Sequence, residues 1–434
     1  ISLEPIAAII GFVLAMVAVW LALALLGLLL AVFHFFNGDE TAITRYFNRR
    51  HEQKGFEALA DGMVALAAGE GKTAVAKAAK AERYLNRPEL THLINAQAAE
   101  LTGDRPRAMR YYKSLLSDDR TRFVGIKGIL KQKLAEGDTD TALKLAEKAF
   151  AIRPDHAETM NTLFALQSAK AEWRGASKTI AAEVKAHVLP KDVGQRREAV
   201  LELADARAQL DAANIEAGKA AALKANKLSP GLVPAAVLAA EMHMLDDSKR
   251  AAGNVLRKAW GLNPHPDLAA AFAEIEPDET PSERIKRFAS LIKRNPEHEE
   301  SKLLQAELAL ADEDFPAARR AIHGMIEKKP RPRVLSIMAA VEKGEGAEDK
   351  VVHAWLNKAL SAPRGPHWIC DSCGKIHGQW APICDNCSGF DTIDWKEPND
   401  TPDQRTTTAL VSLTPDVVTG ERQSDEDAPV LHEK

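Results

Sequence analysis

Four cysteines near the end of the chain are the residues whose types and spacing could do chemistry. Cys370 and Cys373 form one CxxC pair, and Cys384 and Cys387 form a second pair after ten intervening residues. Two residues between cysteines let both thiolates of a tight turn face one ion, and two such turns give a tetrahedral site of four sulfurs. Zinc suits such a site, and so does iron. The sequence therefore predicts a metal site at these four cysteines.

The spacing favours a structural zinc ion. Four protein ligands leave no coordination position open for a substrate. Two disulfides or a redox pair are the alternatives, but a redox CxxC normally stands on a helix that follows a strand. Ferric iron is the alternative metal, and it would suit electron transfer or haem handling. His367 and His377 flank the motif and could replace a cysteine as a ligand.

Other chemistry finds little support in the sequence. The chain has no CxxCH haem-attachment sequence. Gly71-Lys72-Thr73 resembles the end of a phosphate-binding loop, but the glycine required five residues earlier is Leu66. No nucleophile–base constellation can be identified, so we name no catalytic residues and expect no enzyme. Haem binding stays open, without a residue to support it.

The elements that must position the cysteines form a small module, which we place at residues 363–396. So small a module cannot bury enough core alone, and a structural zinc ion contributes on the order of 10 kcal/mol of folding free energy. We expect backbone N–H groups to donate to the thiolates, as in rubredoxin-type sites. Four aromatic residues flank the cysteines: Trp368, Trp380, Phe390 and Trp395. They could form a mini-core around the ion, seal the last repeat, or contact a partner.

The composition of the first residues predicts a membrane anchor. Between Glu4 and Asp39 there is no Asp, Glu, Lys or Arg, and the run from Ile6 to Phe36 is almost entirely apolar. A helix needs about 20 apolar residues to span the hydrocarbon of a bilayer. We therefore predict a transmembrane helix at residues 1–37. The chain begins with isoleucine, and we expect that an earlier segment precedes it.

The segment after this run carries a cluster of basic residues, which we assign to a juxtamembrane segment at residues 38–54. The cluster includes Arg45, Arg49, Arg50 and Lys54. By the positive-inside rule this end faces the cytoplasm. The absence of cysteine outside the metal motif fits a reducing compartment. The predicted location is a bacterial inner membrane, with the soluble part in the cytoplasm.

Residues 55–362 show helical periodicity with an internal repeat. Alanines recur at intervals of 34 residues, at Ala74, Ala108, Ala142 and Ala176. Five residues before each alanine stand Gly69, Gly103, Gly137 and Ala171, where we expect the turn between two helices. This period is that of tetratricopeptide (TPR) repeats, whose stacked helix pairs form a superhelix with a concave groove. We predict an all-α solenoid of eight or nine helix pairs, with residues 190–212 as a less typical pair.

The predicted partners follow from the array. Concave grooves of such arrays bind peptides or proteins, and the alternative is a spacer that holds the metal module away from the membrane. A net charge of −4 gives no indication of nucleic-acid binding. We expect protein partners at the groove and the zinc module. After the module, residues 397–434 are rich in Thr, Asp and Pro without apolar periodicity, so we predict a disordered acidic tail.

An apolar anchor, a TPR array and a terminal CxxC…CxxC module together resemble the HemY family of haem-biosynthesis-associated membrane proteins. Three stretches carry the resemblance: NGDETAITRYFNRR from Asn37, DDRTRFVGIKGILKQKLAEGD from Asp118, and WAPICDNCSGFDTIDW from Trp380. The resemblance implies a scaffold linked to haem metabolism. The layout is also similar to the lipopolysaccharide assembly regulator family of LapB, which implies an adaptor that controls the proteolysis of a biosynthetic enzyme.

Overall fold

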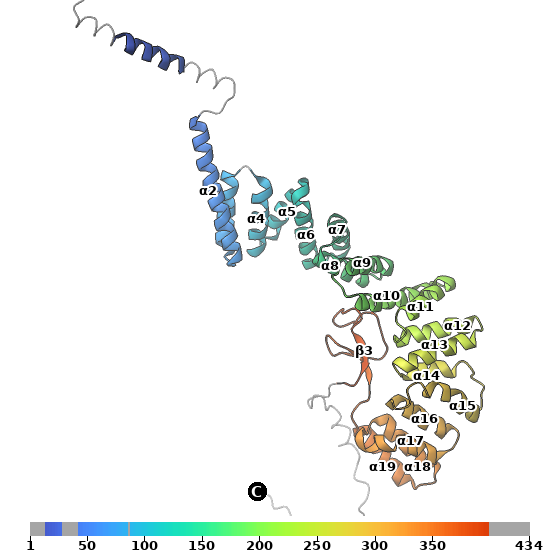
Figure 1. The fold of residues 1–434 in the computed structure, drawn as a ribbon. Helices are drawn as coiled ribbons and strands as arrows, with labels where there is room; N and C mark the ends of the chain where they lie inside the picture. The colour runs from blue at the N-terminus through green and yellow to red at the C-terminus, as the bar shows by residue number, and fades with distance from the viewer. Residues whose placement is uncertain (1–13, 28–41, 86, 399–434) are drawn as a thin grey trace, which may run out of the picture. The chain divides into compact units, whose positions relative to one another are not determined.

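The computed structural model describes residues 14–27, 42–85 and 87–398 (Figure 1). Residues 14–27 form a helix whose side chains are exposed. Among the described residues, no helix combines the length and the apolar character that a membrane crossing requires. The predicted transmembrane helix at residues 1–37 lies largely outside the described residues, and so does nearly all of the predicted acidic tail.

The chain divides into two compact units, Ile1–Leu166 and Gln167–Lys434. From Ala42 onward, the secondary structure described in the first unit consists of helices. Its helices are α2 (Ala42–Ala67), α3 (Gly71–Tyr84), α4 (Pro88–Leu101), α5 (Arg105–Ser114), the 3-10 turn η1 (Leu115–Ser117), α6 (Asp119–Ala135) and α7 (Thr139–Ile152), with α8 (Ala157–Ala169) crossing the boundary. Helix α2 includes most of the predicted juxtamembrane segment. It continues past residue 54, so no break separates that segment from the repeat array.

The second unit continues the helical array and carries the cysteine module. Its helices are α9 (Trp173–Lys185), α10 (Lys191–Asp211), α11 (Ile215–Leu228), α12 (Val233–Leu245), α13 (Lys249–Leu262), α14 (Pro266–Ala273), α15 (Pro281–Ile292), α16 (Glu299–Ala311), α17 (Phe315–Lys328), α18 (Pro332–Gly344) and α19 (Asp349–Ser361). The described residues from 42 to 361 thus form nine successive helix pairs, in agreement with the predicted all-α repeat array.

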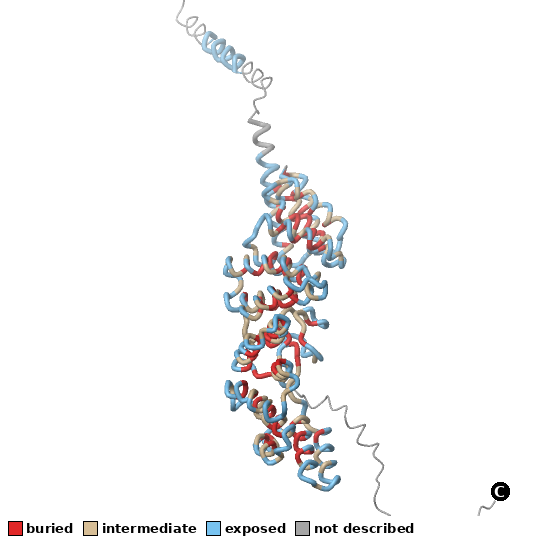
Figure 2. Tube along the Cα trace, turned by 90° about the vertical axis from the view of Figure 1, so that its right-hand side faces the viewer, coloured by how far each residue is buried: buried red, intermediate tan, exposed pale blue. Residues whose placement is uncertain are grey.

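Small residues let the helices of a pair approach closely. The repeating alanines Ala74, Ala108, Ala142 and Ala176 are fully buried, and so are Ala252 and Ala318 in later pairs. Figure 2 shows the buried residues along the facing sides of the helices and the exposed residues on their outer sides. Because packed interiors tolerate little extra volume, these positions need a methyl side chain.

The turns within the pairs have a common geometry. Gly69, Gly103 and Gly137 adopt φ angles of 75°, 77° and 75°, in the left-handed region that favours glycine. Ala171 occupies the same position with a φ of 56°. The following helix often begins with an aspartate that accepts a hydrogen bond from a backbone amide of the first turn, as Asp138 does from Thr141 at 3.1 Å.

Segment 190–212 departs from the prediction of a helix pair. It forms the single helix α10, which is 21 residues long. Pro190 precedes the helix as its N-cap, and Gly194 stands in its first turns, where neither residue interrupts the hydrogen-bond ladder. From Gln195 to Asp211 the sequence contains neither glycine nor proline, so the helix continues and pairs with α11.

The cysteine module contains a three-stranded antiparallel sheet in the order β2-β1-β3. The strands are β1 (His367–Cys370), β2 (Ile376–His377) and β3 (Ile393–Lys396). Trp368 lies opposite His377 in β2 and opposite Trp395 in β3. Strand β1 is therefore central, and it ends on the first cysteine.

Candidate functional site

The four cysteines come together in one cluster. Their sulfur atoms all lie within 4.8 Å of one another. Cys370 Sγ is 3.6 Å from Cys387 Sγ, and Cys373 Sγ is 3.6 Å from Cys384 Sγ. A disulfide requires about 2.05 Å, whereas two sulfurs on one tetrahedral zinc ion with 2.3 Å bonds are about 3.8 Å apart. The geometry fits a metal ion held by all four thiolates, and it does not identify the metal.

The two CxxC turns have nearly the same backbone. In the first, Cys370 N–H donates to Lys375 O at 3.0 Å, and Gly374 N–H donates to Cys370 O at 2.9 Å. In the second, Cys384 N–H donates to Gly389 O, and Ser388 N–H donates to Cys384 O, both at 2.9 Å. Because the two turns share one geometry, each supplies two sulfurs to the same point, one pair from each side.

The surroundings of the sulfurs are arranged for thiolates. Burial opposes ionisation of Cys370, but hydrogen bonds from Thr392 and from the Cys373 and Ser372 amides lower its pKa to about 6. Hydrogen bonds from the Asn386 side chain and the Lys375 amide lower the pKa of Cys373. Backbone N–H groups therefore stabilise negative sulfur, as the sequence predicted.

The fourth thiol shows what a cation at the centre of the cluster would contribute. The Gly389 amide lowers the pKa of Cys387, but desolvation and the neighbouring sulfurs raise it to about 12. Several thiolates cannot share so small a volume because like charges repel. A divalent cation at the centre would remove this repulsion and hold all four sulfurs deprotonated. Zinc there would complete the fold of the module without leaving a position for a substrate.

The two flanking histidines differ in their distance from the cluster. His377 Nε2 lies 3.5 Å from Cys384 Sγ, and its Nδ1 lies 3.6 Å from the carboxylate of Asp385. His377 is thus placed to hydrogen-bond a ligand sulfur. His367 is engaged elsewhere, since its Nδ1 lies 2.7 Å from the Gly365 carbonyl oxygen. Of the two histidines, only His377 stands near the sulfurs.

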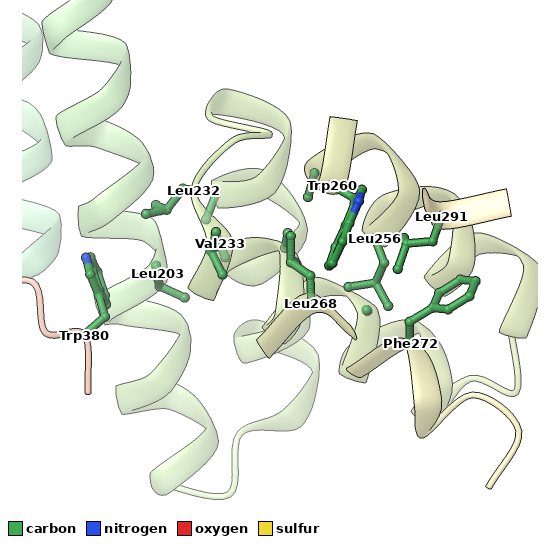
Figure 3. Packing of buried hydrophobic residues seen from close by; sticks show 14 of the residues in the cluster. Leu203, Leu232, Val233, Leu256, Trp260, Leu268, Phe272, Leu291 and Trp380 are labelled. Atoms are coloured by element: carbon green, nitrogen blue, oxygen red, sulfur yellow. The ribbon is translucent and has the colours of Figure 1, made fainter. Parts of the chain in front are cut away.

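The module docks against the repeat array of the second unit. Trp368, Cys370, Trp380, Cys384 and Ile393 share one core with residues of α10 to α16. Figure 3 shows Trp380 facing Leu203 of α10, and the core continues through Val233 and Leu268 to Trp260. One interpretation of the sequence was that the aromatic residues seal the last repeat. The structure does not place Trp368 and Trp380 there. They pack on the middle of the unit instead.

Polar contacts fix this docking. Arg196 of α10 makes hydrogen bonds of 3.1 to 3.2 Å to both carboxylate oxygens of Asp391. His265, the N-cap of α14, packs against Trp368 and Trp395 with ring centroids 5.0 and 4.3 Å away. A two-point contact between a guanidinium and a carboxylate sets orientation as well as distance. Sequence analysis missed these residues because they lie more than 100 positions from their partners.

The first unit has a groove of its own. Side chains of α4, α6 and α8 line a pocket of about 360 Å³. Lys127 pairs with Glu158 there, and Lys131 Nζ lies 2.6 Å from Glu100 of α4. Tyr112 of α5 donates a hydrogen bond to the same Glu100 at 2.8 Å. Sequence reasoning predicted a partner groove but could not identify these residues, because each repeat supplies only a few of them.

Comparison with known proteins supports part of the resemblance. The family model described as "HemY protein N-terminus" matches residues 1–103. This match confirms the resemblance to HemY for the predicted anchor and the first repeats. It does not extend to the metal module.

One curated relative shares part of the chain. The "Probable magnetosome protein Mms48" of Magnetospirillum gryphiswaldense is 27% identical over 164 residues, which are 38% of this chain and 36% of that protein. The match therefore spans about a third of the relative's length. It is a likeness between segments of two larger chains.

Solved structures with similar arrangements include "Structure of Naa15/Naa10 bound to HypK-THB", at 15% identity and a TM-score of 0.39, over 71% of this chain and 49% of that chain. Another is the "TPR2AB-domain:pHSP90-complex of yeast Sti1", at 15% identity and a TM-score of 0.28, over 70% of this chain and 98% of that chain. At these TM-scores neither likeness carries an argument about partners or mechanism.

Proposed function

We propose that the chain is a membrane-tethered scaffold that binds protein partners of haem (tetrapyrrole) biosynthesis or trafficking. The observation that carries the proposal is the match of residues 1–103 to the HemY N-terminus, joined to a helical-repeat array. The apolar run from Ile6 to Phe36 is the proposed tether, with the array on the cytoplasmic side of a bacterial inner membrane.

The first-unit groove is the proposed binding surface for a protein segment. Its lysines and glutamates form ion pairs across neighbouring repeats, Lys127 with Glu158 and Lys131 with Glu100. These pairs are partly exposed, so they cost little to break and can exchange for pairs with a partner. The cysteine module packs on the array of the second unit. The surface of the module that stays exposed is the second proposed contact with a partner.

The proposed role of the metal is structural. Four cysteines would hold zinc, and the ion would maintain the surface that docks on α10 to α16. No chemical step is assigned to the chain. Iron is the alternative occupant, and measurement of the metal content together with visible absorption of the purified chain separates the two, because ferric tetrathiolate sites absorb visible light and zinc sites do not.

Affinity purification from membranes tests the proposal. The wild-type chain should retain enzymes of the haem pathway, and a Lys127→Glu/Lys131→Glu variant should lose them. Lys148→Glu, an exposed change on α7, is the matched control and should retain them. Retention of a membrane protease with an envelope-lipid enzyme would contradict the haem assignment in favour of the adaptor role. Equal retention by all three proteins would exclude the first-unit groove.

A further inference from the structure

A large cleft separates the cysteine module from the repeat array of the second unit. Its volume is about 1160 Å³. One wall is made by the N-terminal ends of α12, α14, α16 and α18, and the other by residues 364–368 and 394–397 around strands β1 and β3. The metal cluster lies outside the lining, so the cleft is a feature distinct from the cysteine site.

The array wall favours negative charge. Four helix N-termini open onto the cleft, and each presents the positive end of a helix dipole. His265, His298 and Arg331 are the N-cap residues of α14, α16 and α18. None of the three carries a negative charge. At α14 and α16 a histidine Nδ1 accepts the hydrogen bond of a first-turn amide, whereas at α5, α7 and α17 the acceptor is an aspartate carboxylate, of Asp104, Asp138 and Asp314.

A buried donor in the cleft lacks a partner. His265 lines the cleft and is 1% exposed. Its Nδ1 accepts a hydrogen bond from Asp267 N–H at 3.1 Å, so the proton of the neutral ring resides on Nε2. Among the described residues, Nε2 has no hydrogen-bond partner. A buried donor without a partner is costly, which points to an acceptor that is not part of the described structure.

One end of the cleft already holds a carboxylate. Arg331, which is 8% exposed, contacts Glu299 at 2.8 Å through Nη1 and Glu397 through Nη2. Lys329 Nζ lies 3.7 Å from the same Glu397 carboxylate. Arg364 lines this end too, and no ion pair to it is seen within the described part of the chain. Glu397 belongs to the last residues that the structure describes.

We propose that this cleft is a binding site for extended acidic peptide segments, and that residues 399–434 of the same chain are its occupant. The segment starts one residue after the described chain ends at the cleft, beside Arg331 and Lys329. It contains eight acidic and three basic residues. The occupant thus continues the carboxylate contact that Glu397 begins.

Charge fits an acidic segment, and connectivity favours this occupant over a free acidic peptide. The cleft lining has six basic residues (Arg196, Lys329, Arg331, Arg333, Arg364 and Lys396) and five acidic ones (Glu297, Glu299, Glu300, Asp394 and Glu397). Among these basic residues, Arg364 is the one with no ion pair within the described part of the chain. The four helix N-termini add positive potential to the array wall. A tethered segment has an effective concentration on the order of millimolar, so weak ion pairs suffice for occupancy. A partner's acidic segment would have to displace it.

Limited trypsin digestion of the full chain tests the proposal, with cleavage after Arg405 followed by mass spectrometry. Proteolysis tracks the population of the open form, so cleavage of the wild-type chain should be slower by about tenfold than cleavage of a cleft variant, Lys329→Glu/Arg364→Glu. Lys258→Glu, an exposed change on α13, is the matched control and should keep the wild-type rate. High salt should accelerate cleavage of the wild-type chain towards the rate of the cleft variant.

A second variant protects the test against a folding defect in the array. Asp425→Asn/Glu426→Gln/Asp427→Asn changes only the C-terminal segment, far from the cleaved bond, and should raise the rate as the cleft variant does. Equal rates for the wild-type chain and both variants would overturn the proposal. The assay contains no partner protein, so its result is independent of the proposed scaffold function.

Discussion

Ala142 and Cys384 are both fully buried, yet they stabilise their regions of the molecule in different ways. Ala142 is one of many small residues that recur along the array, and each acts only on its own helix pair and the next. Cys384 is one of four residues that share a single point. The array therefore distributes its stability along the chain, whereas in the module four ligand groups converge on one point that fits a single ion.

The comparison is tested most strongly by removing metal ligands. Cys370→Ser/Cys373→Ser should unfold the module, because loss of the ion removes on the order of 10 kcal/mol of folding free energy. Metal content should fall, tryptophan fluorescence should shift as Trp368 and Trp380 become exposed, and helical circular dichroism should persist. Ser372→Ala, at an exposed site in the same turn, is the control. Unchanged fluorescence in the double variant would show that the module folds without metal.

The contact between the two regions should be sensitive to acid through His265. Burial, with a smaller effect of Arg333, lowers the pKa of His265 from 6.5 to about 4. The unfolded chain binds this proton below pH 6.5 and the folded chain resists it, so stability present at pH 7 is lost as the pH falls to about 4. The difference corresponds to about 3 kcal/mol.

His265→Asn isolates this contribution. Asparagine retains an acceptor for the Asp267 amide but does not titrate. Denaturant unfolding should then show a smaller loss of stability between pH 7 and pH 5 than in the wild-type chain, while the thiolates contribute equally to both proteins. Parallel pH curves would contradict the assignment.

Overpacking one repeat should have a local effect. Ala142→Leu should destabilise the first unit by about 1–3 kcal/mol, because the added carbons meet the buried residues of the facing helix. Ala151→Leu places the same side chain at an exposed position of α7 and should cost little. Chemical denaturation followed by circular dichroism measures both. If metal content also fell in Ala142→Leu, the two regions would be coupled more strongly than we propose.

Loosening the docking of the module should cost less. Arg196→Ala removes the paired hydrogen bonds to Asp391, which is half-buried, and should lower the stability of the docked module by about 1–2 kcal/mol. Arg196→Lys should recover only part of this, since an ammonium cannot make the two-point contact. The thermal midpoint of tryptophan fluorescence is the measurement. Arg250→Ala, at an exposed site on α13, should leave it unchanged.

The smallest expected effects on stability come from substitutions in the two CxxC turns. Gly374 and Ser388 occupy equivalent positions, with φ angles of 73° and 57°. Ser388→Gly should stabilise the metal-bound module by about 0.5 kcal/mol, and Gly374→Ala should destabilise it by about 1 kcal/mol. Metal release by a chelator, followed against concentration, measures both changes. A destabilising Ser388→Gly would show that the serine side chain has a role beyond the turn.

The sequence alone determined the repeat period and the set of four cysteines that cluster. Both are local patterns: alanine at intervals of 34 residues follows from close helix packing, and two CxxC turns need no distant residue to point their sulfurs at one ion. The first turns were found because glycine marks a left-handed backbone. Later turns at Ala213, Asp247 and Glu313 have the same geometry without that mark, so they could not be identified.

Only the tertiary structure decided where the module rests. Arg196 and Asp391 are 195 residues apart, and nothing near either residue indicates the other. The placement of Trp380 on α10 depends on the curvature accumulated over several repeats, which small rotations between helix pairs set and a periodic pattern does not encode. The same accumulated curvature brings four helix N-termini and two sheet strands around one cleft. Local spacing determines which chemistry a residue can perform, whereas the accumulated geometry of the repeats determines which residues it contacts.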